Sequence, residues 1–130
     1  MIRTITIIFS TLLFSLTATA HHSFPAQYDI NQPIELSGTV TEVQWTNPHI
    51  FIMVDVVDEE ANETVNWILE LGGPHTLLRL GWKRDSLKPD DRLQVEGSLA
   101  RNGSPLVNTT RIIMEATGKR MLAGSSRDSQ

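Results

Sequence analysis

Three histidines carry the most specific chemistry in this sequence. His21 and His22 directly follow Ala20, and His49 ends a Trp-Thr-Asn-Pro-His motif. Cleavage of a leader after Ala20 would make His21 the first residue of the mature chain, with a free α-amine beside its imidazole. An amine and two imidazoles in a T-shaped arrangement form a histidine brace, and square-planar nitrogen ligation suits Cu(II). The sequence therefore predicts a metal site of His21, His22 and His49, with copper as the preferred ion.

Two alternatives stay open for these residues. His22 can replace His21 as the imidazole donor, because the amine, the intervening peptide nitrogen and the second imidazole also form a chelate. Adjacent terminal histidines are also often merely solvated, and His49 can instead hydrogen-bond its own turn. Met53, four residues after His49, is either a soft axial ligand or, as we favour, a core residue.

Residues 1–20 have the three-part pattern of a secretory signal peptide. They contain one charge at Arg3, an apolar run over residues 5–16 and the sequence Ala18-Thr19-Ala20, which matches an A-x-A cleavage site. The apolar run is shorter than the roughly 20 residues that span a bilayer. We therefore expect export to the periplasm, cleavage after Ala20 and no membrane span in the mature protein.

Composition narrows the classes of partner and of metal ligand. Without Arg3 the mature chain keeps 10 basic against 15 acidic side chains, and the sequence has no basic run, which argues against a nucleic-acid partner. The absence of cysteine excludes disulfides and thiolate metal sites, so stability must come from packing. The 110 residues left of 130 support one domain with a modest core.

Alternating apolar and polar residues predict a first strand over residues 34–45. The alternation slips between Val40 and Val43, shortly after Gly38, which predicts a bulge or bend that lets one strand belong to both halves of a small barrel. Further strands are expected over 50–57, 64–71, 93–99 and 109–115, with a short helix between Pro74 and Gly81. This order predicts an all-β fold with one short helix, a five-stranded OB-like Greek-key barrel.

The expected organisation is a signal peptide at 1–20, an N-terminal arm at 21–33, the OB-like domain at 34–122 and a disordered tail at 123–130.

The three tryptophans are expected to have two different roles, in the core or near a site. Trp67 and Trp82 are expected in the core, because so small a domain needs its aromatic rings for packing. Trp45, beside the loop of His49, is the one expected near a site.

Four sequence blocks carry a resemblance to a known family. They are His21-His22-Ser23-Phe24, Trp45-Thr46-Asn47-Pro48-His49, Leu80-Gly81-Trp82-Lys83-Arg84-Asp85-Ser86-Leu87-Lys88-Pro89 and Ala123-Gly124-Ser125-Ser126. In this order they resemble a family of small exported bacterial proteins with no established biochemical function. The resemblance implies an exported single domain and supplies no activity. Asp90 and His75 depart from the glycine and asparagine expected there, so no site is built on His75.

These observations favour a periplasmic metal-binding protein that handles or delivers copper. The alternative is a non-enzymatic accessory module whose barrel binds a periplasmic partner protein or a small extracellular ligand. A copper-dependent oxidative enzyme is the third reading, and it needs an open coordination position and a substrate surface. The sequence contains no G-x-S-x-G or H-E-x-x-H motif, and a non-enzymatic role is favoured.

Overall fold

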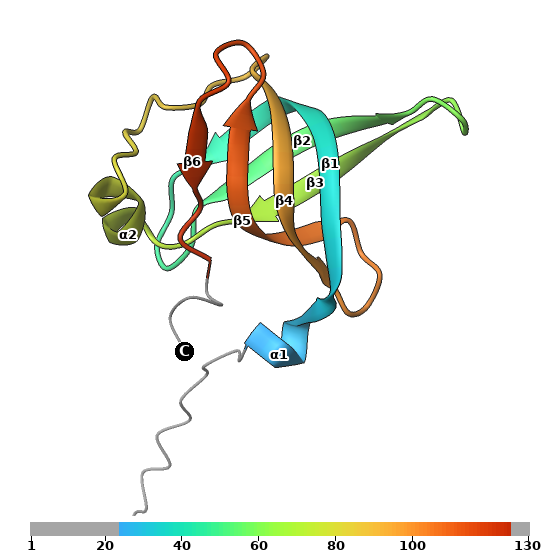
Figure 1. Cartoon of the computed structure of the whole chain (residues 1–130), viewed down its shortest axis with the longest axis horizontal. Coiled ribbons are helices and arrows are strands. Elements are labelled where there is room, and N and C mark those ends of the chain that lie inside the picture. Colours follow the sequence, from blue (N-terminus) through green and yellow to red (C-terminus); the bar gives the residue numbers. More distant parts are fainter. Residues whose placement is uncertain (1–23, 126–130) are drawn as a thin grey trace, which may run out of the picture.

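A computed structural model describes residues 24–125, which form six strands and two short helices (Figure 1). In chain order these are α1 (Phe24–Gln27), β1 (Tyr28–Gln44), β2 (Phe51–Asp58), β3 (Glu63–Glu70), α2 (Pro74–Arg79), β4 (Arg92–Ala100), β5 (Leu106–Met114) and β6 (Arg120–Leu122). Neither helix in this range is long and apolar enough to cross a membrane. The predicted all-β class, with a helix between the third and fourth strands, is confirmed.

The strands form one sheet that closes on itself. Neighbouring strands follow the order β3-β2-β1-β4-β5-β6, and β3 also pairs with β5. The β3–β5 pairing is parallel and the others are antiparallel. The strands β1, β2, β3, β5 and β4 therefore make a ring, which is the five-strand closure that the sequence predicts, while β6 extends the sheet beyond β5.

The long first strand serves two neighbours, as its pattern predicts. Its first part pairs with β4 as far as Thr39, and its last part pairs with β2 from Thr39 onward. The register shifts between Val40 and Glu42, so the slip in alternation does mark a bulge. A Cβ atom at Gly38 would lie 3.0 Å from the carbonyl oxygen of Asp55, which explains why glycine precedes the bend.

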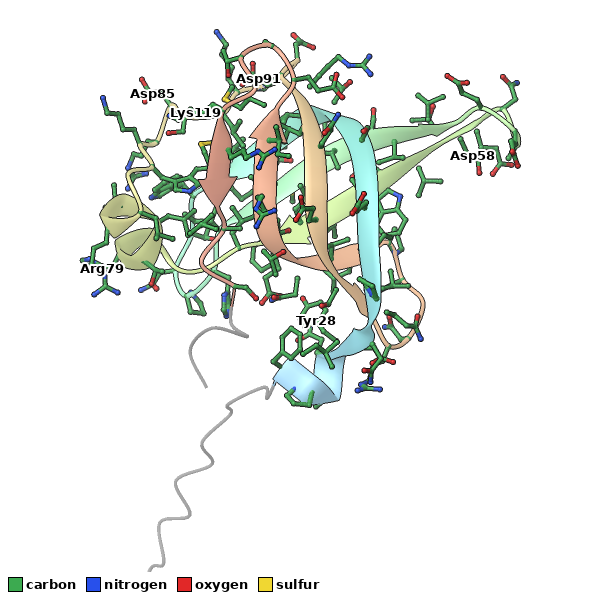
Figure 2. The ribbon with its side chains drawn as sticks, in the orientation of Figure 1. Tyr28, Asp58, Arg79, Asp85, Asp91 and Lys119 are labelled. Atoms are coloured by element: carbon green, nitrogen blue, oxygen red, sulfur yellow. The ribbon has the colours of Figure 1, made fainter. Side chains whose placement is uncertain are left out.

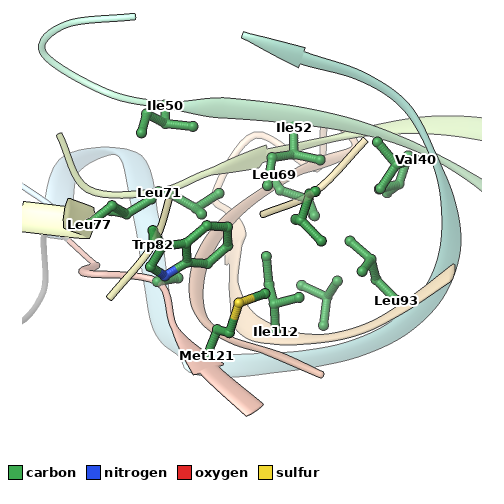
Figure 3. Close-up of a cluster of buried hydrophobic side chains, with 14 of the residues drawn as sticks. Val40, Ile50, Ile52, Leu69, Leu71, Leu77, Trp82, Leu93, Ile112 and Met121 are labelled. Atoms are coloured by element: carbon green, nitrogen blue, oxygen red, sulfur yellow. The ribbon is translucent and has the colours of Figure 1, made fainter. Parts of the chain in front are cut away.

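The core fills the ring and continues under α2 (Figure 3). Trp82 is 3% exposed, and its indole Nε1 donates a hydrogen bond to the carbonyl oxygen of Leu122 at 2.8 Å. The prediction that Trp82 belongs to the core is confirmed, and Trp67 packs against the core while partly buried. Helix α2 ends before Gly81, which adopts a φ of +89°, the left-handed conformation expected at a helix end. Buried core residues include Val40, Ile50, Ile52, Val54, Leu69, Leu71, Leu77, Leu93 and Ile112.

Both predicted boundaries of the domain differ from the structure. Strand β1 begins at Tyr28, inside the predicted arm at 21–33, and its register jumps between Tyr28 and Pro33. Residues 29–32 show no alternation of apolar and polar side chains, so the sequence pattern did not reveal this part of the strand. At the other end, Ala123 and Ser125 of the predicted disordered tail are buried, since Ala123 accepts a hydrogen bond from the backbone of Gly72. Residues 126–130 lie outside the described range.

Candidate functional site

A cavity of about 590 Å³ lies at one end of the ring. Its walls come from α1, the loop between β1 and β2, the loop between β4 and β5, and the adjoining strand ends. In OB-type folds these two loops are the usual place for ligands, and the volume falls in the range of small-molecule sites. The lining residues are Ala26, Gln27, Tyr28, His49, Phe51, Glu70, Ala100, Arg101, Asn102 and Leu106.

A buried tyrosine and a buried glutamate meet in this cavity. Tyr28 begins β1 and is 1% exposed, and Glu70 ends β3 and is 7% exposed. The hydroxyl of Tyr28 donates a hydrogen bond to Glu70 Oε2 at 2.5 Å, while the ring of Phe24 packs 5.6 Å from the tyrosine ring. Burial, together with the hydrogen bond to the carboxylate and its charge, raises the pKa of Tyr28 well above the ordinary value for tyrosine.

His49 lies beside this pair, with one ring nitrogen already engaged. Its Nδ1 is 3.1 Å from the carbonyl oxygen of Leu71 and 3.6 Å from Glu70 Oε1. Because a carbonyl oxygen only accepts, Nδ1 of the neutral ring carries the proton and Nε2 keeps its lone pair. No hydrogen bond to Nε2 comes from any residue in the range 24–125. The neutral His49 ring is thus set in the tautomer that ligates a metal through Nε2.

Backbone contacts fix the loop that carries His49. Thr46 Oγ1 donates a hydrogen bond to the His49 carbonyl oxygen at 2.7 Å, and the backbone of Ile50 bonds to residues 71 and 72. A Cβ atom at Gly72 would lie 2.2 Å from the carbonyl oxygen of Gly124, and one at Gly73 would lie 2.7 Å from that of Pro48. The two glycines therefore let the chain pass between the His49 loop and the C-terminal segment.

Arg101 ties the opposite wall to the N-terminal segment. Its Nε donates a hydrogen bond to the carbonyl oxygen of Pro25 at 2.7 Å, and its Nη1 lies 3.5 Å from Asp29 Oδ2. Together with the Tyr28 hydrogen bond, these contacts hold α1 against the cavity from two sides. Helix α1 is therefore part of the cavity wall, together with the loop that carries His49.

The structure places only part of the predicted metal site. His49 lines the cavity, whereas His21 and His22 lie outside the described residues. Within residues 24–125 there is no group of three or more His, Cys, Asp and Glu side chains that could hold a metal ion. Met53, considered above as an axial ligand, is not among the residues that line the cavity.

Sequence reasoning missed Tyr28 and Glu70. Glu70 stands between leucines in the stretch Trp67-Ile68-Leu69-Glu70-Leu71, and a lone carboxylate in an apolar run at a strand end is a usable signal for a buried acid. Tyr28 is the only tyrosine of the chain, but it stands in a polar stretch with no strand pattern. Nothing in the sequence pairs it with a residue 42 positions away.

Trp45 lies where two of the sequence blocks meet. The guanidinium carbon of Arg84 is 5.9 Å from the centre of the Trp45 ring, so the loop after β1 contacts the loop after α2. The tryptophan is half-buried and packs against the core. It does not line the cavity around His49.

The fold and the cavity define a small all-β domain with a closed sheet and, between its loops, a pocket that contains His49, Tyr28 and Glu70. The chain belongs to a family of unknown function (DUF6152), whose sequence model matches residues 11–108. This agrees with the expectation of a family without an established function, and it carries no activity over to the chain. No curated protein matches the chain.

Proposed function

We propose that this protein is exported to the periplasm and binds a divalent transition metal, preferentially copper, in metal handling or delivery. The proposed donors are the α-amine and imidazole of His21, with His22 as the alternative imidazole, and Nε2 of His49. The observation that carries the proposal is the hydrogen bond from His49 Nδ1 to the carbonyl oxygen of Leu71. It leaves Nε2 as an acceptor, on the wall of a cavity that residues 26–28 also line.

The reach of the chain supports this donor set. His21 is three residues before Phe24, and three residues of extended chain span at most about 10 Å. Phe24 itself packs on Tyr28, which lines the same cavity as His49. A leader cleaved after Ala20 would therefore leave a new terminus joined by three residues to α1, whose residues Ala26 and Gln27 line the same cavity as His49.

The surroundings of His49 resemble the outer shell of a metal-bound imidazole. Ligating histidines usually donate their second ring nitrogen to a carbonyl or a carboxylate, which fixes the ring and increases its basicity. His49 has both groups near Nδ1, the Leu71 carbonyl oxygen and Glu70 Oε1. Tyr28 in turn holds Glu70 through Oε2. Tyr28 and Glu70 are therefore proposed to orient the His49 ligand without touching the metal.

Copper titration of the mature protein tests the proposal. One alanine inserted before His21 separates the amine from that imidazole and leaves residues 24–125 unchanged, and His49→Ala removes the third nitrogen. Each change is expected to weaken copper binding by about 10-fold or more, comparable with the loss of a ligand or its support. His75→Ala is the matched control, because His75 is an exposed histidine on α2. Equal affinities in all four proteins would refute the site.

The same titration has a pH signature. An unperturbed α-amine loses its proton near pH 8, so copper must displace a proton from it at neutral pH. The affinity of the mature protein is expected to fall as the pH decreases below about 8, with protons released on binding. Mass determination of the periplasmic protein decides whether the chain begins at His21, since any other start removes the amine chelate.

A second function is favoured by the buried carboxylate of Glu70. Its Oε2 accepts the Tyr28 hydroxyl, whereas its Oε1 has only the His49 Nδ1 atom at 3.6 Å nearby among the described residues. Because a buried carboxylate is costly unless it is paired, the cavity also suits an accessory module that binds a small ligand with an amine or ammonium group. Native mass spectrometry of the metal-free protein tests this function. A retained organic mass that disappears in Glu70→Gln would favour it over metal binding.

A further inference from the structure

The lysines and arginines of the described residues divide into two groups. Arg92, Arg101 and Arg111 each form an ion pair with an acidic side chain. The remaining cations have no ion pair with any residue in this range, and all of them are exposed. These are Arg79, Lys83, Arg84, Lys88, Lys119 and Arg120. Six basic side chains are therefore left without an ion-pair partner among the described residues.

The unpaired cations gather on one side of the fold. They belong to α2, the loop after it and the hairpin that leads into β6, and neither residues 71–84 nor residues 116–125 contain an acidic residue. The two segments are adjacent, because Trp82 Nε1 donates its hydrogen bond to Leu122 and one hollow is lined by both Leu80 and Arg120. Figure 1 shows α2 on the β6 side of the ring.

Three exposed leucines lie among these charges. Leu78 is 51% exposed, Leu80 is 44% exposed and Leu122 is 57% exposed. We name this surface the leucine-cation face and define it as the three leucines with Arg79, Lys83, Lys119 and Arg120. Apolar side chains that project beside unpaired basic ones are the pattern of a surface that lies in a membrane interface.

A cluster of acidic residues lies at the opposite end of the molecule, while Asp85, Asp90 and Asp91 belong to the loop after α2. The hairpin between β2 and β3 carries Asp58, Glu59, Glu60 and Glu63, all exposed. Figure 2 shows Asp58 at the far end of the molecule from Arg79. The chain has a net charge of −4, but this separation lets the leucine-cation face approach a negative surface while the hairpin points away from it.

We propose that the leucine-cation face docks onto an anionic lipid bilayer. The headgroups of an anionic bilayer are mobile and negatively charged, so they can contact all the long basic side chains at once. The boundary of its acyl chains can accept the leucines. A partner protein would need fixed carboxylates opposite each cation. The inference is independent of the metal site, which lies at the loops between β1 and β2 and between β4 and β5.

The absence of cysteine allows one fluorescent reporter to be placed at will. Leu122→Cys and Val57→Cys are each labelled with a polarity-sensitive fluorophore. Val57 is the control, because it is an apolar residue on the acidic hairpin whose exposure of 64% is similar to the 57% of Leu122. Vesicles of phosphatidylglycerol are expected to shift the emission at position 122 to shorter wavelength and to leave position 57 unchanged. Vesicles of phosphatidylcholine are expected to shift neither.

A charge variant completes the test. Arg79→Gln with Arg120→Gln in the Leu122→Cys protein should lower the partition onto anionic vesicles about 10-fold or more. Ala61→Glu with Thr64→Glu changes the net charge equally on the hairpin and should lower it far less. No shift at 122, an equal shift at 57, or equal effects of the two charge variants would overturn the proposal. Retention on polyaspartate without vesicle binding would do so in favour of an acidic protein partner.

Discussion

The Tyr28 hydroxyl should keep its proton at a pH where an ordinary tyrosine loses it. Burial and the adjacent Glu70 carboxylate raise its pKa, because a phenolate would be desolvated beside a negative charge. Tyr28 is the only tyrosine, so the ultraviolet absorbance of tyrosinate reports this group alone. In the folded protein this absorbance is expected to stay absent above about pH 10, where free tyrosine ionises. It should appear only when the protein unfolds.

The stability of the fold should follow from the same shift. A raised pKa means that the folded state retains a proton that the unfolded state releases above about pH 10. The contribution to stability is complete below that pH and decreases as the pH rises further. The slope from one group is at most about 1.4 kcal/mol per pH unit. Urea unfolding at several pH values, combined with circular dichroism, measures this slope.

Tyr28→Phe is the matched variant. It removes the donor to Glu70 Oε2 and keeps the ring that packs on Phe24, so the free energy of unfolding at neutral pH should fall by about 1–3 kcal/mol. Adding Glu70→Gln should cost less in the Phe variant than in the native protein, because the two residues interact directly. If the native, folded protein shows tyrosinate absorbance with an ordinary pKa, the assigned environment of Tyr28 is wrong.

Two further predictions concern packing around the site. Gly72→Ala should lower the free energy of unfolding by about 1–3 kcal/mol or more, because the new Cβ meets a backbone oxygen at 2.2 Å; an unchanged urea midpoint would contradict the close approach. Trp82→Phe should cost about 1–2 kcal/mol through the lost hydrogen bond to Leu122 and lost volume. Val57→Ala, at an exposed position, is the control for both variants. A urea midpoint of Trp82→Phe equal to that of the native protein would contradict the prediction for Trp82.

The sequence predicts the features that local patterns encode. The slip in alternation after Gly38 predicts the bulge, since a one-residue change of face leaves a mark in the order of apolar residues. Proline and glycine likewise bracket α2 correctly. The ring closure follows less directly, because the β3–β5 pairing joins residues 38 positions apart, such as Ile68 and Leu106, and no local pattern records it.

The candidate site was predictable only where a motif carries it. His49 stands out by its loop motif, but the hydrogen bond that sets its tautomer comes from Leu71, which only the folded chain brings near. The distribution of charge on the surface likewise depends on the folded chain. The sequence shows no basic run, yet the fold places the segment of Arg79 and Lys83 next to that of Lys119 and Arg120, and so forms the leucine-cation face. Pairing of distant segments decides both features, so composition alone gives the wrong picture of the surface.

Because the fold gathers basic residues on the leucine-cation face, the prediction of weak nucleic-acid binding now also tests whether this face binds any polyanion. Single-stranded DNA needs a cationic groove and exposed aromatic rings on which bases stack. Trp82 is buried, and Trp45 is half-buried and carries Arg84 over its ring, so the leucine-cation face offers charge without a stacking surface. The acidic remainder of the chain opposes a long polyanion.

Affinity for single-stranded DNA at physiological salt should therefore be weak and non-specific, as expected when only charge contributes. A fluorescence titration with a labelled oligonucleotide measures it, and Arg79→Gln with Arg120→Gln should lower any binding at low salt. Anionic vesicles should still bind under salt conditions in which the DNA does not, because the leucines add an apolar contribution that salt does not screen. Tight DNA binding at physiological salt would show that charge alone governs this face, and the distinction between a bilayer and a nucleic acid would fail.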